Sequence, residues 1–360
     1  MQHQRQKLKY LNIQLGPRIR ERVLSGQLLP DDIQSMIGAS GGARWMVLSG
    51  LDQFLFGHWF RDRTTPLSVI GSSIGTWRFL CAAQADPVST FQHLESAYIE
   101  SSATLDRSSS ATRVIDQTRG VLVDVIGETG AKQLLEHPYL RAQLLATKCK
   151  YISQSDRGWV QLLTVALSQL LNRISRRGLA LLYERILFHD PRLTDLAAFD
   201  NDFKLTYCPL NENNVVDAVM ASSSIPMILP GIRHIDGGPK GVFRDGGILD
   251  YHFSEKTIND SGVTLYTHFF PYLVPGWFDK SLSHRHRQAA DFDNLMLLSP
   301  SQAFINLLPI AKIPDRNDFM RLDTQTRIHF WRTTCDQSRR LADDFAEFIH
   351  APSRYQAALA

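Results

Sequence analysis

Two adjacent serines lie in a segment whose residue types are typical of nucleophilic catalysis. The segment SVIGSSIGTW runs from apolar residues into GSSIG. This is G-x-S-x-G, the pattern that places a nucleophilic serine on a tight turn between a strand and a helix. Only Ser73 occupies the central position, so Ser73 is the candidate nucleophile, with Gly71 and Gly75 as supporting residues. We predict that Ser72 packs against the turn or caps it.

A serine hydroxyl attacks an ester only when a base takes its proton and N–H groups stabilise the oxyanion that forms. Gly41, Gly42, Ala43 and Arg44 lie between two apolar segments, about thirty residues before Ser73. Glycines at such a position allow the backbone to approach a reacting oxygen closely. The spacing leaves room for one helix and a returning strand. Alone the loop indicates only a tight turn, but beside G-x-S-x-G it predicts oxyanion donors.

Two copies of Asp-Gly-Gly are candidates for the base. By itself, Asp-Gly-Gly indicates only a turn. Asp236 is followed by Gly-Gly-Pro-Lys, which indicates a loop. Asp245, with Gly246 and Gly247, follows an apolar segment and precedes another, GILDYHF. Of the two, only Asp245 is flanked by apolar segments on both sides.

Taken in order, these segments resemble the patatin-like phospholipases. That family has a glycine-rich loop with G-G-x-R, then G-x-S-x-G, an apolar A-S-S-x-x-P segment and finally D-G-G. The corresponding segments here are GGAR (41–44), GSSIG (71–75), ASSSIP (221–226) and DGG (245–247). The resemblance covers about residues 33–82 and 139–255.

The resemblance implies a Ser-Asp dyad that works without a histidine. Ser73 would be the nucleophile, Asp245 its base, and the N–H groups of Gly41, Gly42 and Ala43 the oxyanion donors. It also implies a three-layer α/β fold, with a mainly parallel central sheet and helices on both faces. The implied activity is hydrolysis of carboxylic esters of acyl lipids through an acyl-enzyme, without cofactor or metal.

The chain departs from the family at the glycine-rich loop. The family loop begins Asp-Gly-Gly-Gly, whereas Ala39 and Ser40 precede the two glycines here. Trp45 follows the arginine, where glycine is common in the family. These differences leave the exact N–H donors open.

Two other interpretations of the same residues stay open. G-x-S-x-G also serves α/β-hydrolases with a Ser-Asp-His triad, and His252 and His268 follow Asp245 in the order that fold requires. Against a triad, the sequence has no H-G-G-G motif, and more than 170 residues separate Ser73 from Asp245. The third interpretation is a catalytically silent lipid-binding or interaction protein of the same fold. Such a protein needs neither the Ser73 hydroxyl nor the Asp245 carboxylate.

The elements that must position these groups alternate between strand and helix. WMVLSGLDQFLFGHWF and TWRFLCAAQ are apolar segments of helical length, each after a shorter apolar run. Strands are predicted at 33–38, 66–71, 141–152, 241–244 and 263–268. This alternation predicts an α/β layered domain with a mainly parallel sheet.

The domain organisation follows from the same patterns. We expect a basic helical arm over 1–30 and a catalytic domain over 31–270. A helical insertion is expected at about 156–190, inside that domain. A mostly helical region over 271–360 is expected to pack on the same domain.

The predicted insertion also has features of a membrane-surface helix. Its apolar blocks alternate with Arg173, Arg176 and Arg177, which would contact anionic headgroups. The alternative is a core helix with solvated arginines. We predict transient contact with a membrane surface.

Composition places bounds on the partners and the compartment. The 360 residues are 44% hydrophobic and 21% charged, enough for one large domain or two small ones. A net charge of +3 is too small to indicate nucleic-acid binding. The expected partner, an acyl lipid, is what the family resemblance implies. Scattered cysteines and the absence of an apolar leader favour a cytoplasmic location, with peripheral membrane association and leaderless export left open. The oligomeric state and the lipid class stay open.

Overall fold

The computed structural model describes residues 8–104, 110–253 and 262–358. Within these residues, ten strands form one mixed sheet with the order β1-β10-β9-β2-β3-β4-β5-β6, while β8 pairs with β4 and β7. The strands are β1 (Leu11–Leu15), β2 (Ile33–Gly38), β3 (Leu67–Ser72), β4 (Leu140–Cys149), β5 (Tyr183–His189), β6 (Leu205–Pro209), β7 (Ile232–Arg233), β8 (Val242–Asp245), β9 (Val263–Thr267) and β10 (Leu295–Pro300).

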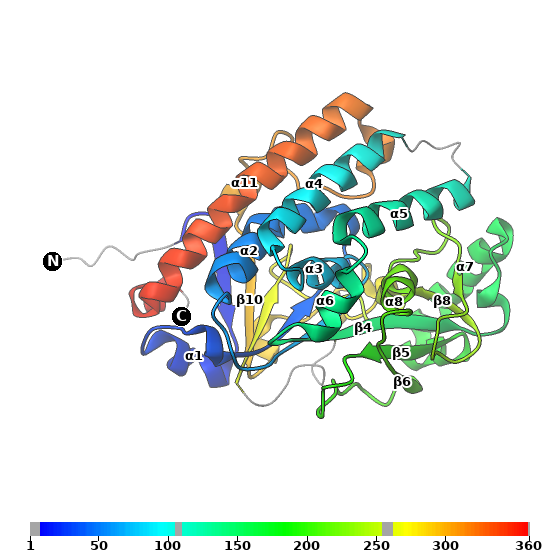
Figure 1. The fold of residues 1–360 in the computed structure, drawn as a ribbon, viewed down its shortest axis with the longest axis horizontal. Coiled ribbons are helices and arrows are strands. Elements are labelled where there is room, and N and C mark those ends of the chain that lie inside the picture. The colour runs from blue at the N-terminus through cyan, green and yellow to red at the C-terminus, as the bar shows by residue number, and fades with distance from the viewer. Residues whose placement is uncertain (1–7, 105–109, 254–261, 359–360) are drawn as a thin grey trace.

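The helices occupy most of the chain between the strands. The α-helices are α1 (Pro17–Leu24), α2 (Ser49–Phe54), α3 (Ile74–Ala82), α4 (Pro87–Thr104), α5 (Ala111–Ile126), α6 (Gly130–Glu136), α7 (Gly158–Ile174), α8 (Val215–Ser222), α9 (Gln302–Ile305), α10 (Asp318–Arg321) and α11 (Thr324–His350). Short 3₁₀ helices include η2 (Gly42–Leu48), η4 (Tyr151–Gln154), η5 (Arg176–Leu181), η6 (Gly246–Ile248) and η8 (Trp277–Asp279). In Figure 1, α2, α3, α4 and α11 lie together, and α7 lies at the opposite end of the molecule from α1.

The centre of the sheet is parallel, with β10, β9, β2, β3 and β4 running in one direction. These strands are apolar on both faces, as expected for strands in the interior of an α/β domain. Antiparallel pairs lie outside this centre, where β1 joins β10 and where β5 and β8 join β4. The predicted α/β class is confirmed, and the finer three-layer arrangement stays a prediction.

The register of the strands brings the predicted site residues to one point. Gly38 pairs with Gly71, so the segments that follow β2 and β3 leave the sheet side by side. Ser72 pairs with Leu145 on β4, and the next β4 residue pairs with Asp245 on β8. The end of β8 therefore lies beside the end of β3, although 172 positions separate Ser73 from Asp245 in sequence.

Helix α3 is fixed by a buried ion pair as well as by apolar packing. The Arg78 guanidinium donates to both carboxylate oxygens of Asp52 on α2 at 2.6 Å. It also donates to the Thr267 hydroxyl at the end of β9. All three side chains are buried, so these contacts hold the helix after Ser73 against its neighbours.

The structure differs from the expected secondary structure inside three of the predicted regions, while the domain boundaries themselves stay a prediction. Residues 11–15 form β1 rather than part of a helical arm, because their buried side chains alternate with period two. The range 156–190 contains strand β5, which pairs with β4 and β6, so only its first part is an α-helix. The range 271–360 contributes β10 to the sheet. No helix in the described part of the chain has the length and apolarity that crossing a bilayer requires.

Candidate active site

Ser73 occupies a strained turn between β3 and α3. Its backbone has φ 54° and ψ −127°, a region that residues with a side chain seldom adopt. The turn is held on both sides: the Ser73 N–H donates to the Ser222 hydroxyl at 2.8 Å, and the Ser73 carbonyl accepts from the Thr76 N–H at 2.9 Å. This is the geometry that exposes a serine hydroxyl on a sharp strand-to-helix turn.

The glycines of G-x-S-x-G allow this turn to pack closely. A Cβ on Gly75 would lie 2.1 Å from the carbonyl oxygen of Gly38, because the first turn of α3 crosses the end of β2. A Cβ on Gly71 would lie 2.9 Å from the backbone carbon of Gly75. No side chain fits at Gly75 unless the helix moves away from the sheet.

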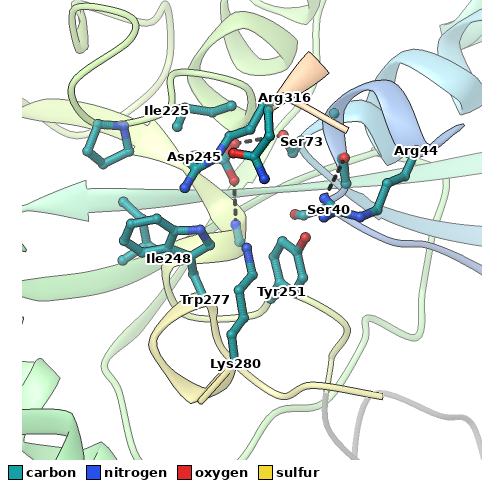
Figure 2. A pocket seen from close by; sticks show the side chains of 15 residues that line it. Ser40, Arg44, Ser73, Ile225, Asp245, Ile248, Tyr251, Trp277, Lys280 and Arg316 are labelled. Carbon is teal, nitrogen blue, oxygen red and sulfur yellow. Dashed lines mark hydrogen bonds between the residues drawn. The ribbon is translucent and has the colours of Figure 1, made fainter. Parts of the chain in front are cut away.

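The Ser73 hydroxyl and the Asp245 carboxylate form a direct hydrogen bond. Ser73 Oγ donates to Asp245 Oδ2 at 2.6 Å, and the Gly247 N–H donates to Asp245 Oδ1 at 2.7 Å. Ser73 is 4% exposed and Asp245 is 7% exposed. Burial raises the pKa of Asp245 to about 6, against the opposing effects of these two hydrogen bonds and of the nearby Lys280 charge. Figure 2 shows Ser73, Asp245 and Lys280 around one cavity.

The raised pKa makes the Asp245 carboxylate a stronger base. An ester-cleaving site that works near neutral pH gains from a base whose pKa is closer to that pH. Gly246 makes the arrangement possible. A Cβ on Gly246 would lie 2.3 Å from the Leu145 carbonyl oxygen on β4, so a larger residue would displace the carboxylate from the strand end.

The glycine-rich loop forms the wall beside Ser73. Gly41, Gly42 and Arg44 line the same cavity as the dyad, whereas Ala43 is buried and is not part of the lining. Across the described residues, no protein group accepts the N–H of Gly41 or Gly42. The role of these two groups as oxyanion donors stays a prediction. Arg44 Nη1 donates to the Gly41 carbonyl at 3.3 Å, which fixes the orientation of that peptide.

Ser72 has the packing role that its position predicts. Its side chain is completely buried, and its Oγ accepts a hydrogen bond from Ser40 Oγ at 2.9 Å. The Ser40 N–H in turn donates to the Tyr251 carbonyl at 3.1 Å. The Ser72 hydroxyl thus joins the glycine-rich loop to β3 and is not exposed in the cavity.

The cavity has an excess of positive charge. Lys280 Nζ lies 4.0 Å from the centre of the Tyr251 ring and 5.4 Å from the Trp277 ring, and the Arg316 guanidinium lies 5.7 Å from the Trp277 ring. In the described part of the chain, no carboxylate lies within 4 Å of Lys280 or Arg316. Part of the Lys280 side chain reaches solvent. Burial of its ammonium group and repulsion by Arg44 and Arg316 lower the pKa of Lys280 to about 7.

The histidines of the alternative triad lie elsewhere. The rings of His252 and His268 are buried with their centres 4.2 Å apart, and neither residue lines the cavity. His252 Nδ1 accepts the Val274 N–H at 2.9 Å. Burial lowers the pKa of His268 to about 3. Among the described residues, no histidine contacts Asp245, so the geometry does not support a Ser-Asp-His triad.

Asp236, the other candidate base, is exposed and accepts a hydrogen bond from Asn211 at 3.0 Å. It lies outside the cavity lining. The structure describes no cluster of three or more His, Cys, Asp or Glu side chains that could hold a metal ion.

Several residues of the site have no clear signal in the sequence. Ser222 belongs to the segment ASSSIP, but only the structure indicates its role, which is to accept the Ser73 N–H and to donate to the Leu145 carbonyl. Lys280 and Arg316 belong to segments without a motif, and the folded chain brings them to the cavity from C-terminal loops.

Comparison with known proteins adds little to this geometry. No protein-family model matches the chain, and no curated protein matches it. Among solved structures, VipD from Legionella pneumophila superposes with a TM-score of 0.30 and 14% sequence identity. The match covers 73% of this chain and 54% of VipD, so the chain spans about half the length of that protein. A superposition this loose assigns neither a fold nor a function.

Proposed function

We propose that the protein is a lipid acyl hydrolase of the patatin-like type, in which Ser73 attacks a carboxylic ester and Asp245 takes its proton. The observation that carries this proposal is the 2.6 Å hydrogen bond between Ser73 Oγ and Asp245 Oδ2, made at a strained strand-to-helix turn. Neither the strain at Ser73 nor the burial of Asp245 stabilises a fold, whereas both favour nucleophilic catalysis.

The reaction proceeds through an acyl-enzyme. Ser73 Oγ forms a bond to the ester carbonyl carbon while its proton passes to Asp245, and the N–H groups of Gly41 and Gly42 stabilise the oxyanion. Asp245 then returns the proton to the departing alkoxide as the ester C–O bond breaks. In the second half, water gives its proton to Asp245 and attacks the acyl carbon. The carboxylic acid leaves as the proton returns to Ser73.

The cations of the cavity support an ester substrate that also bears an anionic group. Lys280 Nζ and the Arg316 guanidinium lie 5.4 Å and 5.7 Å from the centre of the Trp277 ring, and in the described part of the chain neither has a carboxylate within 4 Å. A phosphate placed between them would accept charge-assisted hydrogen bonds from both. We therefore propose phosphate-bearing acyl esters, such as phospholipids or lysophospholipids, as the substrate class.

Single substitutions at the two adjacent serines test the assignment. Ser73→Ala should abolish hydrolysis of a lysophospholipid and of a short soluble ester. Ser72→Ala, the matched control, should keep most of both activities because its hydroxyl only packs against Ser40. Full activity in Ser73→Ala, or equal loss in both variants with the fold intact by circular dichroism, would refute the assignment.

A further inference from the structure

Helix α7 is amphipathic in the opposite sense to an ordinary surface helix. A helix at the surface of a globular domain normally turns its apolar side inward. The buried side chains of α7 are instead polar: Gln161, Thr164, Ser168 and Asn172. Its exposed apolar side chains are Trp159 (68%), Leu162 (62%), Leu163 (55%), Leu170 (57%) and Ile174 (77%). At 100° per residue, these five positions fall on one side of the helix.

The buried polar side chains fix this orientation. Gln161 Oε1 accepts the Met227 N–H, and Asn172 Nδ2 donates to Asp279 Oδ1 at 2.7 Å. Both partners belong to segments that line the cavity: Pro226 precedes Met227, and Trp277 lies with Asp279 in η8. Because these hydrogen bonds pair α7 with the Met227 N–H and the Asp279 carboxylate, rotation of α7 to bury its leucines would remove a partner from both groups.

The apolar side of α7 continues onto neighbouring segments. Met227 and Ile228 are 52% and 41% exposed, directly after the cavity-lining residues Ile225 and Pro226. Helix η4, which packs against α7, adds Tyr151 at 78% exposed. We call the exposed apolar residues of α7, η4 and the 227–228 turn the α7 surface. Helix α7 lies at one end of the molecule (Figure 1), and the 227–228 turn directly follows the cavity-lining residues Ile225 and Pro226.

Exposed positive charges lie at both ends of α7, and Asp156, which precedes the helix, is paired with Arg233 and Arg244. Helix α7 itself contains no aspartate or glutamate. Arg157, Arg173 and Arg177 are exposed at its two ends. Arg176 differs from them, because it is paired with Asp202 at 3.0 Å and with two further buried carboxylates. Arg176 therefore anchors the chain, contrary to the sequence-based expectation that it contacts headgroups.

We propose that the α7 surface docks onto the interface of a lipid bilayer, with its apolar side chains at the headgroup boundary and the exposed arginines on anionic lipid. The cavity of about 260 Å³ is smaller than the ~300–1,000 Å³ of sites that enclose a drug-sized ligand, so acyl chains must pass over its edge. The docking proposal depends only on the exposed apolar residues and arginines. The delivery of lipid to Ser73 rests on the proposed function.

Vesicle binding by the catalytically inactive Ser73→Ala protein tests docking without turnover. Sedimentation with phosphatidylcholine–phosphatidylglycerol vesicles is compared with pure phosphatidylcholine. Leu163→Ser with Ile174→Ser should weaken binding to the anionic vesicles at least tenfold. Val123→Ser, which replaces an exposed apolar residue on α5, is the matched control and should leave binding unchanged.

Two further measurements separate the possible failures. In the active protein, the double variant should lose hydrolysis of vesicle lipid but keep cleavage of a short soluble ester. Trp159 fluorescence, taken as the difference between the protein and Trp159→Phe, should be quenched by brominated acyl chains. Unchanged vesicle binding by the double variant, or a dimer that this variant dissociates, would overturn docking. Vesicle binding without any ester hydrolysis would refute the proposed function and leave docking standing.

Discussion

Burial of the Asp245 carboxylate should lower the stability of the folded protein in a way that depends on pH. Its pKa rises from an ordinary value of 3.8 to about 6, and a shift of this size corresponds to about 3 kcal/mol. Below about pH 4 the carboxyl is protonated in both states and costs nothing. Between about pH 4 and 6 only the unfolded chain loses the proton, so each pH unit lowers the free energy of unfolding by about 1.4 kcal/mol. Above about pH 6 the cost is constant.

Asp245→Asn removes this cost. We expect the variant to be inactive and yet more stable than the parent by up to about 3 kcal/mol at pH 7, or about 4 °C in Tm for a chain of this length. The gain should shrink toward zero at about pH 4. Urea denaturation from pH 4 to 8 measures it. Asp236→Asn is the control, because that side chain is exposed and should change stability by less than about 0.5 kcal/mol. A variant less stable than the parent at pH 7, or a gain independent of pH, would refute the inferred burial of Asp245.

Three further predictions concern activity. His252→Gln should keep kcat/KM within a factor of about three while Asp245→Asn loses several orders of magnitude, and equal losses in correctly folded variants would favour a histidine base. The kcat/KM for a neutral soluble ester should rise about tenfold per pH unit up to about pH 6 and then level, because Asp245 must be ionised to accept the proton; a rise that continues to pH 8 would exclude it as the base. Lys280→Gln with Arg316→Gln should reduce the preference for a phosphate-bearing ester over a neutral ester of equal chain length about tenfold or more. The control Lys132→Gln, which changes an exposed side chain of α6, should preserve that preference, and an unchanged preference in the double variant would place the anionic group elsewhere.

Local sequence patterns were sufficient to predict the two turns of the site that directly follow strands. G-x-S-x-G and Asp-Gly-Gly are short-range patterns, and each requires a turn directly after a strand, which the structure has at Ser73 and at Asp245. The predicted strands of the parallel centre also form, because continuous apolar runs of strand length are typical of strands that are buried on both faces of a sheet. The catalytic roles of the two residues stay predictions.

Other features depend on tertiary contacts that no local pattern encodes. Residues 11–15 form a strand because β10 offers them an edge, although helical spacing of leucines continues across them. The sequence predicts that the α7 segment either packs in the core or lies on a membrane surface. Which side of the helix is buried depends on polar partners such as Asp279. Lys280 and Arg316 reach the cavity from loops far along the chain, so their proximity follows only from the folded structure.

Covalent labelling of the intact protein with a serine-directed fluorophosphonate, followed by peptide mapping, tests the central claim most directly. We predict one phosphonylated residue, Ser73, with labelling lost in Ser73→Ala, slowed by orders of magnitude in Asp245→Asn and retained in Ser72→Ala. Absence of label in the correctly folded protein, or label on Ser72 or another serine, would contradict it.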